Sequence, residues 1–318
     1  MKTQKAVITA AARNERLYPA ATTVQKSMLP VIDIDGLNKP IIQIIAEEAL
    51  QSGIEEICIV CASGDEERYL ESFHTLYDTS LLYQQSTGVS SQAQSIKNIL
   101  DRLTFVVQSE PLGYGHAVYQ AKDFVKNEPF LLLHGDYLSI SNLPDKRCAK
   151  QIINLAGEEE CSVAAVHPTI EHQISKYGTL TGRNYKTYNG VYQIEKIIEK
   201  PSISQAELEL KTAGLRNGYY LCFFGMYVFQ PTLFDLLAEE IQSRSTNPKS
   251  QRNILLTPVQ QKLAQNEKYL ALEIQGKRYD TSKKFGLMQA QIALGLAGQK
   301  RDEVLTALVQ TLADYRKD

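Results

Sequence analysis

An apolar run that ends at a Gly-Asp pair is the first place where this chain could carry chemistry. Residues Phe130–His134 read Phe-Leu-Leu-Leu-His and are followed by Gly135 and Asp136. A run of large apolar residues is typical of a strand that is buried on both faces, as in a parallel sheet. A carboxylate that follows such a strand lies at the edge where open α/β sheets bind their ligands. Asp136 is therefore a candidate ligand for a metal or a substrate, although a Gly-Asp pair also closes many strands as an ordinary turn.

A second candidate segment follows the first apolar stretch of the chain. The small residues Ala10–Ala12 come directly after Lys5–Thr9, and Arg16 and Lys26 lie further along the same loop. Small residues let backbone N–H groups approach a phosphate or a flat base, and basic side chains offset the charge of a triphosphate. The segment is a candidate phosphate-binding loop, but taken alone it is more typical of a solvated basic loop.

The elements that must position these residues alternate between strand and helix in the first half. The patterns predict strands at Lys5–Thr9, Met28–Ile32, Glu56–Cys61, Thr104–Gln108 and Pro129–His134. They predict helices at Pro40–Gln51, Glu66–Phe73 and Gly115–Val125. This βαβ order indicates an α/β fold with right-handed crossovers, namely a Rossmann-like mixed, mainly parallel sheet flanked by helices.

The second half has a different order of predicted strands and helices, but it is not predicted to be a separate domain. The patterns predict strands at Cys161–Val166, Val191–Ile194 and Tyr219–Phe229, and helices at Pro231–Ile241, Lys283–Leu296 and Glu303–Tyr315. The segment Gln242–Arg252, rich in Ser, Asn and Pro, is predicted to be a mobile loop. With no internal repeat and no long linker, we expect one domain over 1–318, made of halves 1–140 and 141–282 followed by C-terminal helices at 283–318.

Composition excludes several classes of protein. The 318 residues are 43% hydrophobic and 22% charged with a net charge of −2, which argues against disorder and against a nucleic-acid-binding or membrane-surface protein. The five cysteines are an odd number, typical of reduced buried thiols. Cys58 and Cys61 have the C-x-x-C spacing but lie in a predicted strand, where they face opposite sides and cannot form a zinc site. The chain shows no signal peptide and no membrane-spanning run, so we expect a soluble cytoplasmic protein.

Several motifs together resemble one family over almost the whole chain. They are Lys26-Ser27-Met28-Leu29-Pro30, Pro111-Leu112-Gly113-Tyr114-Gly115, Gly135-Asp136, Lys176-Tyr177-Gly178, Glu199-Lys200-Pro201 and Tyr279-Asp280-Thr281. Their order and spacing are similar to those of the sugar-1-phosphate nucleotidyltransferases, and most of all the bacterial UTP–glucose-1-phosphate uridylyltransferases. The resemblance implies transfer of a uridylyl group from UTP to glucose 1-phosphate, giving UDP-glucose and pyrophosphate.

The resemblance also implies roles for charged residues. Asp136 and Asp280 would hold Mg²⁺, a hard cation suited to a few carboxylates with phosphate oxygens and water. Arg16 and Lys26 would face the triphosphate, and Lys200 would meet the sugar phosphate. Each residue also fits an ordinary structural role: Lys26 as a surface lysine, Asp280 as a helix cap and Lys200 as a turn residue. The proline after Lys200 is expected to bias that residue towards an extended backbone.

Polar and small residues would complete the binding site. Glu199 would accept hydrogen bonds from sugar hydroxyls, and Gly178 would allow close backbone approach. The residues implied to frame the uracil are Ala10, Ala11, Gln108 and Gly113. His116 and His134 are expected to be packing residues, because the reaction requires no proton abstraction. By resemblance the protein would be a homodimer or homotetramer, which exposed apolar positions in the terminal helices also favour.

This chain departs from the family pattern at the phosphate loop. Where the family carries Gly-x-Gly-Thr-Arg, residues 12–16 read Ala-Arg-Asn-Glu-Arg, so that Glu15 places negative charge near the triphosphate. Two alternatives to UDP-glucose synthesis therefore stay open. One is a non-catalytic regulatory homologue that binds sugar nucleotides, and the other is a nucleotidyltransferase for another sugar phosphate or another nucleotide such as dTTP.

Overall fold

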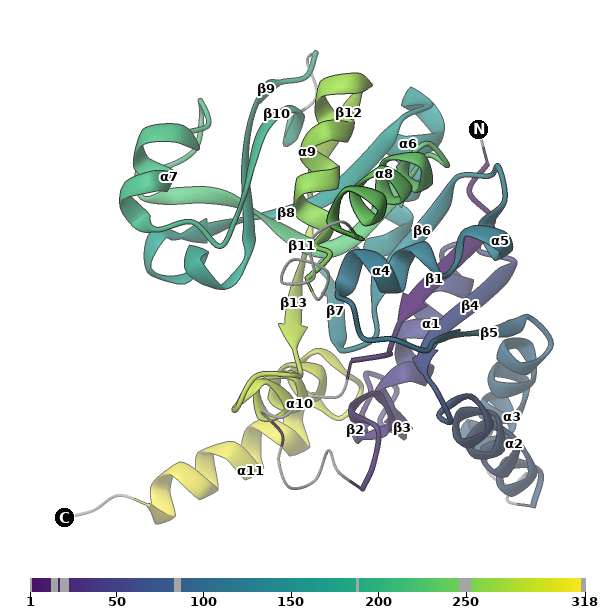
Figure 1. Ribbon diagram of the computed structural model, residues 1–318. Helices are drawn as coiled ribbons and strands as arrows, with labels where there is room; N and C mark the ends of the chain where they lie inside the picture. The colour runs from purple at the N-terminus through teal and green to yellow at the C-terminus, as the bar shows by residue number, and fades with distance from the viewer. Residues whose placement is uncertain are drawn as a thin grey trace.

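A nine-stranded mixed sheet forms the centre of the molecule, with helices on both of its faces (Figure 1). The structure is a computed structural model that describes residues 2–12, 17, 23–82, 87–186, 189–245 and 253–315. The strands in spatial order are β5 (Leu103–Gln108), β4 (Glu56–Ala62), β1 (Lys5–Thr9), β6 (Phe130–His134), β11 (Tyr219–Phe229), β8 (Ser162–Ile170), β12 (Tyr269–Glu273), β10 (Val191–Glu199) and β9 (Gly178–Asn184).

Strand direction changes at the middle of the sheet. The pairs β5–β4, β4–β1 and β1–β6 are parallel, whereas β6–β11, β11–β8 and β10–β9 are antiparallel. The predicted α/β fold class is confirmed, but antiparallel pairing is more extensive than the βαβ rhythm of the first half suggested. In the second half, β9 and β10 form a hairpin, which reverses the chain without a crossover helix, and β11 runs antiparallel to β6, β8 and β9.

Two groups of helices cover the two faces. The helices packed on one face are α1 (Ile41–Gln51), α2 (Glu66–Leu82), α3 (Thr87–Leu100) and α6 (Cys148–Glu159). α10 (Gly286–Ala297) joins the same core cluster from beside the sheet. Those on the other face are α4 (Tyr114–Tyr119), α5 (Lys122–Val125), α8 (Leu233–Ser245) and α9 (Leu256–Asn266). The short α7 (Ile203–Glu209) packs with the 3-10 helix η4 (Glu171–Lys176) beyond the sheet, and α11 (Arg301–Asp314) projects from the body (Figure 1).

Two small ladders lie outside the main sheet. β7 (Tyr137–Ser141) pairs antiparallel with β13 (Gly276–Asp280), and β2 (Pro30–Ile32) pairs with β3 (Asn38–Pro40). The 3-10 helix η3 (Lys26–Met28) leads into β2, so the predicted strand at Met28–Ile32 begins two residues later than expected. The β7–β13 ladder brings the middle of the chain and its last third together.

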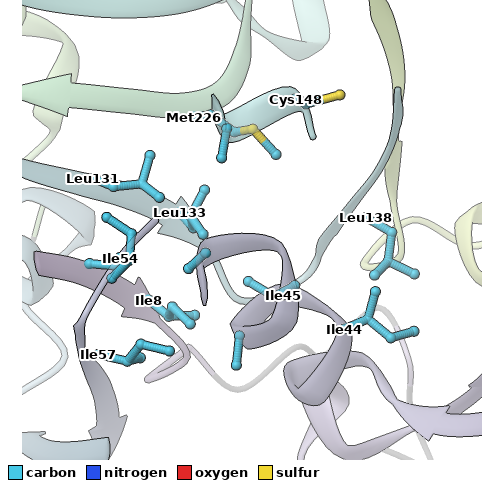
Figure 2. Close-up of a cluster of buried hydrophobic side chains, with 14 of the residues drawn as sticks. Ile8, Ile44, Ile45, Ile54, Ile57, Leu131, Leu133, Leu138, Cys148 and Met226 are labelled. Carbon is cyan, nitrogen blue, oxygen red and sulfur yellow. The ribbon is translucent and has the colours of Figure 1, made fainter. Parts of the chain in front are cut away.

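Side-chain alternation along the strands divides the core into two layers. In β6, Leu131 and Leu133 face one layer, and Phe130 and Leu132 face the other. Figure 2 shows Leu133 in the layer that also contains Ile45 of α1. These four side chains are at most 2% exposed, which confirms the prediction that this strand is buried on both faces.

Four of the five cysteines lie in these two layers, and Cys222 lies in a third, smaller cluster. Cys58 and Cys61 lie in different layers, as expected for opposite sides of β4, and all five cysteines are free and buried. Within the described ranges, no helix has the length and apolar character that crossing a membrane requires.

Several predicted boundaries were wrong. The helix predicted at Gly115–Val125 is two short helices, α4 and α5, and the terminal helix predicted from Lys283 begins at Gly286. α2 runs to Leu82 instead of ending at Phe73, because its apolar side continues through Leu76 and Tyr77, which pack against the core. α8 continues to Ser245, so residues 242–245 are helical and not part of a loop. Arg244 stabilises this last turn through a hydrogen bond of 2.6 Å to Glu240. Residues 246–252 of the predicted loop lie outside the described residues.

Candidate active site

Two adjoining cavities open at the carboxyl end of β6. The N-half cavity, of about 540 Å³, is lined by Thr9, Ala11, Lys26, Gln108, Gly113 and Asp136 among others. The C-half cavity, of about 530 Å³, is lined by Asp136, Gly178, Glu199, Lys200, Thr257 and Asp280 among others. Asp136, His134 and Tyr114 line both. A carboxylate therefore stands where a ligand in one cavity would meet a ligand in the other.

The turn after β6 holds Asp136 close to the end of β1. Gly135 donates its N–H to the carbonyl of Thr9 at 2.9 Å, and a Cβ at this position would lie 2.7 Å from the same oxygen. Only glycine allows this approach. Lys26, at the start of η3, donates from Nζ to Asp136 Oδ2 at 2.6 Å, and the two side chains are 10% and 13% exposed. The structure thus brings together two residues that the sequence analysis assigned to the site, and Lys26 is not a surface lysine.

Asp280 reaches the same place from the far end of the chain. It ends β13, where it pairs with Tyr137 of β7. The next residue, Thr281, donates to the carbonyl of Asp136 from its N–H at 3.0 Å and from its hydroxyl at 2.8 Å. Asp280 Oδ1 accepts hydrogen bonds from the N–H of Ser282 at 3.0 Å and its hydroxyl at 2.5 Å. Because Thr281 links the two segments, the positions of Asp136 and Asp280 depend on one another.

The two carboxylates fit a hard divalent cation. Both line the C-half cavity, and carboxylate oxygens with phosphate oxygens and water are the ligands that Mg²⁺ prefers. Within the described part of the chain, no cluster of three or more His, Cys, Asp and Glu residues is placed to hold a metal. A cation here would therefore need ligands from a bound phosphate in addition to Asp136 and Asp280.

Glycine and glutamine shape the N-half cavity. Gly113 has φ +117°, and a Cβ there would lie 2.6 Å from the carbonyl oxygen of Ile254, so this position requires glycine. Gln108 is 8% exposed, donates from Nε2 to the Gly113 carbonyl at 3.2 Å and lies 3.0 Å from His116 Nδ1. Two of the four residues expected to frame a base are thus in contact with each other.

Ala11 lines this cavity, whereas Ala10 does not. Ala10 is buried, and its N–H donates to the carbonyl of Val60 at 2.7 Å. That N–H is therefore already paired within the sheet and is not turned towards a ligand. Arg16, expected to face the triphosphate, lies outside the described residues, and so does Glu15.

Gly178 and Glu199 face each other across the β9–β10 hairpin. A Cβ on Gly178 would lie 2.8 Å from the ring of Phe223 and 3.1 Å from Glu199 Oε2, so the absence of a side chain leaves room for this carboxylate. Glu199 Oε2 accepts a hydrogen bond of 2.6 Å from the hydroxyl of Thr257 on α9. The predicted pair of sugar-binding residues therefore sits in one wall of the C-half cavity.

The backbone of Lys200 differs from the expectation. Its φ is +48°, in the left-handed region, and not the extended conformation that the following proline was expected to impose. The Lys200 N–H donates to the carbonyl of Tyr177 at 3.1 Å, and this tertiary hydrogen bond overrides the local preference. The side chain is 60% exposed, and its ammonium lies 3.3 Å from Glu199 Oε1. Strain of this kind is often found at functional sites.

Aromatic side chains are the main part of the site that the sequence analysis missed. The His134 ring is stacked against Tyr114 at 4.5 Å and against Tyr137 at 4.8 Å between ring centroids. Burial lowers the pKa of His134, so the ring is neutral at pH 7 and acts as a packing residue. The signal was present in the aromatic residues around the Gly-Asp pair and along Tyr219–Phe229, but apolar runs of this kind are also ordinary core.

Lys283 was also missed, and so was the role of Tyr177, which the sequence analysis quoted only as part of a motif. Lys283 donates from Nζ to the Tyr177 hydroxyl at 2.7 Å, and Arg278 lies over the same ring at 4.0 Å from its centroid. Burial alone raises the pKa of Tyr177, but the hydrogen bond from Lys283 and the charge of Arg278 outweigh it and lower that pKa. No local pattern distinguishes Lys283 from the neighbouring lysine, so sequence alone gave no signal for it.

The chain is similar to known proteins over most of its length. The nucleotidyl transferase family matches residues 5–284. A UTP–glucose-1-phosphate uridylyltransferase 2 of Streptococcus pyogenes serotype M3 is 32% identical over 316 residues, which cover 97% of this chain and 96% of the relative. A second S. pyogenes protein, UTP–glucose-1-phosphate uridylyltransferase 1, is 33% identical over 93% of this chain and 90% of its own length.

Solved structures show the same architecture. A UDP-glucose pyrophosphorylase complexed with UDP-glucose superposes with a TM-score of 0.72 and 29% identity, covering 92% of this chain and 98% of that one. The UDP-glucose pyrophosphorylase of Acinetobacter baumannii superposes over 98% of this chain with a TM-score of 0.77. Its sequence identity is 23%, so this similarity supports only the fold. The fold, the family match over most of the chain and the similarity to the streptococcal proteins agree, and the chain belongs to the nucleotidyl transferase family.

Proposed function

We propose that the protein transfers the uridylyl group of UTP to glucose 1-phosphate, releasing UDP-glucose and pyrophosphate. The observation that carries this proposal is the position of Asp136 at the junction of two cavities, paired with Lys26 on one side and linked to Asp280 on the other. The names of the streptococcal relatives, and the UDP-glucose bound in the similar solved structure, support the choice of substrates.

In this proposal the N-half cavity holds UTP and the C-half cavity holds the sugar phosphate. Gln108, Gly113 and Ala11 surround the base, and Lys26 offsets the charge of the triphosphate. Arg16, outside the described residues, is proposed from the family resemblance to share this role. Glu199 accepts hydrogen bonds from sugar hydroxyls, and Lys200 meets the phosphate of the sugar. The attacking phosphate oxygen is already an anion, so positioning and charge neutralisation supply most of the acceleration and no general base is needed.

We further propose Mg²⁺ as the cation of this site, with Asp136 and Asp280 as its protein ligands. Bound there, the ion would neutralise phosphate charge during transfer. Each carboxylate already lies near an ammonium group: Asp136 near Lys26 at 2.6 Å and Asp280 near Lys283 at 3.2 Å. These lysines limit the repulsion between the two carboxylates, so that the segments can stay together.

A pyrophosphate-release assay tests the proposal and separates it from its rivals. The purified protein is assayed with Mg²⁺, with UTP or dTTP, and with glucose 1-phosphate or other hexose 1-phosphates. Release that is fastest with UTP and glucose 1-phosphate supports the proposal. Faster release with dTTP or another sugar assigns a different nucleotidyltransferase, and no release with any pair, despite binding of UDP-glucose, assigns a regulatory homologue.

The regulatory homologue is favoured by one sequence feature, the glutamate in the phosphate loop. We expect Glu15→Thr to bind UTP more tightly than the native chain, because the change removes a negative charge near the triphosphate. Calorimetry at fixed Mg²⁺ checks this. Tighter binding by the native chain would show that Glu15 does not face the phosphates.

The chain as a whole is proposed to act as one domain over 1–318, in the cytoplasm, as a homodimer or homotetramer. α11 supports self-association because none of its residues is buried and because Leu305, Val309, Leu312 and Tyr315 are between 43% and 82% exposed. Such an apolar stripe is self-complementary across a two-fold axis. Light scattering on the native chain and on Leu312→Lys tests this, and a monomeric native chain would contradict it.

A further inference from the structure

Lys283 lies in the wall of the C-half cavity, between a phenol and a carboxylate. Its ammonium donates to the Tyr177 hydroxyl at 2.7 Å and lies 3.2 Å from Asp280 Oδ2. The Lys283 side chain is 30% exposed, whereas that of Asp280 is 9% exposed. The lysine is therefore held in one place while part of it remains open to the cavity.

Tyr177 holds two lysines of this cavity at once. Its hydroxyl binds Lys283, and its backbone carbonyl accepts the N–H of Lys200 at 3.1 Å. The Arg278 guanidinium lies over its ring, 4.0 Å from the centroid. Tyr177 thus contacts two lysines of the cavity wall, Lys283 through its hydroxyl and the backbone of Lys200 through its carbonyl.

The surrounding groups leave capacity for an anion. An ammonium group has three N–H donors, and the two described contacts of Lys283 use two of them. The other oxygen of Asp280, Oδ1, accepts two hydrogen bonds from Ser282. The negative charge of Asp280 is therefore shared between Lys283 and Ser282. The Lys200 ammonium also keeps donors for an anion, because its ion pair with Glu199 is as long as 3.3 Å and the side chain is 60% exposed. Lysines in this state bind a phosphate as charge-assisted hydrogen-bond donors.

We propose that Lys283 is a second phosphate-binding lysine for the sugar 1-phosphate, and that Tyr177 positions it together with Lys200. The inference rests on the proposed function and adds two residues to it. Lys283 would touch the substrate, whereas Tyr177 would act through the lysines.

The first test compares Lys283→Met with Lys277→Met. Lys277 is an exposed lysine of β13 that does not line the cavity, so its removal is the matched control for charge. We expect Lys283→Met to raise the KM for glucose 1-phosphate by about tenfold or more, as for a lost charge-assisted hydrogen bond, with the KM for UTP changed less than about twofold. Lys283→Arg should restore part of the affinity, and Lys277→Met should leave both KM values unchanged.

The second test addresses positioning by the tyrosine hydroxyl. Tyr177→Phe keeps the aromatic ring and removes the hydroxyl that accepts the hydrogen bond from Lys283. We expect a smaller rise in the KM for glucose 1-phosphate than in Lys283→Met, with kcat nearly unchanged. The double variant should lose no more than Lys283→Met alone, because both changes remove one interaction.

Direct binding separates failure of this inference from failure of the proposed function. Calorimetric titration with glucose 1-phosphate is made on the native chain, Lys283→Met and Lys277→Met. Weaker binding only in Lys283→Met supports the inference even if no turnover is found. Equal binding by all three, or turnover with an unchanged KM, overturns the inference and leaves the proposed function intact. No binding and no turnover in the native chain would overturn both.

Discussion

Lys26 and Asp136 are 110 residues apart in the chain, yet their side chains form an ion pair of 2.6 Å at the junction of the two cavities. The pair connects the loop after β1 with the turn after β6, two segments whose strands are parallel neighbours in the sheet. Each partner is mostly shielded from water, so the loss of either charge leaves the other poorly compensated. The pair therefore holds the site together and also supplies its charges.

Replacement of Asp136 should greatly reduce turnover while the protein stays folded. We expect Asp136→Asn to lose about a hundredfold or more in pyrophosphate release at excess Mg²⁺, as when a preorganised charged group is removed. The free energy of unfolding should fall by about 1–3 kcal/mol because Lys26 loses a charged partner. Urea unfolding and circular dichroism measure the second effect. Asp123→Asn, an exposed change on α5, is the control, and near-normal turnover in folded Asp136→Asn would remove Asp136 from the metal site.

The left-handed backbone of Lys200 predicts that glycine at this position gives a more stable protein than alanine. A residue with a Cβ is strained at φ +48°, whereas glycine is not. Lys200→Gly should therefore be more stable than Lys200→Ala by about 1 kcal/mol, although both lose affinity for the sugar phosphate through the missing ammonium. Thermal unfolding of the two variants, with KM values for each substrate, checks both parts. Equal stabilities would mean that the hydrogen bond to Tyr177 does not hold this conformation in solution.

The hydrogen bond from Thr257 to Glu199 predicts that loss of the Thr257 hydroxyl weakens binding of the sugar phosphate. Thr257→Val keeps the shape of the side chain but removes the donor 2.6 Å from Glu199 Oε2. We expect the KM for glucose 1-phosphate to rise about fivefold, the equivalent of one ordinary hydrogen bond, and Thr257→Ser to restore it. If the valine variant instead binds the sugar phosphate more tightly, then Thr257 competes with the substrate for the carboxylate.

Glu159, at the end of α6, is expected to make the free energy of unfolding depend on pH in the acid range. The hydrogen bond from Lys186, with further ones from Tyr185 and Lys268, lowers the pKa of Glu159 from its usual 4.5 to about 2. A carboxyl with a depressed folded pKa stabilises the protein above pH 4.5, and this contribution is lost as the pH falls towards 2. Glu159→Gln should thus lower the unfolding free energy on the order of 1 kcal/mol at pH 7.

The difference between Glu159→Gln and the native chain should shrink as the pH falls from 4.5 towards 2. Thermal unfolding at a series of pH values measures it. A difference that is the same at pH 7 and at pH 3 would show that the effect of the substitution is not electrostatic.

Much of the fold followed from local patterns. The strands Lys5–Thr9 and Tyr219–Phe229 were predicted with the bounds that the structure has, because each is a continuous apolar or aromatic run. The first half obeys the βαβ rule, so its parallel pairing could also be predicted. The pairing of β11 with both β6 and β8 could not, because register between distant strands depends on tertiary contacts that no local pattern encodes.

The charged residues of the site were easier to predict than the groups that hold them. Asp136 and Asp280 were placed together by motif order, and the structure brings them to one cavity. The backbone of Lys200 was predicted wrongly, since a rule about its neighbour cannot include the hydrogen bond that the Lys200 N–H donates to the Tyr177 carbonyl. Lys283 was not noticed, because its importance depends on where Tyr177 lies in space.

The place of β11 in the sheet has a consequence for biosynthesis. β6 is synthesised early, but one of its edges is covered only when β11 pairs with it, much later in the chain. Until Phe229 has left the ribosome, the nascent protein presents an unpaired and strongly apolar strand edge. Products truncated before Tyr219 should therefore be prone to aggregation and dependent on chaperones, whatever the state of their phosphate-binding residues.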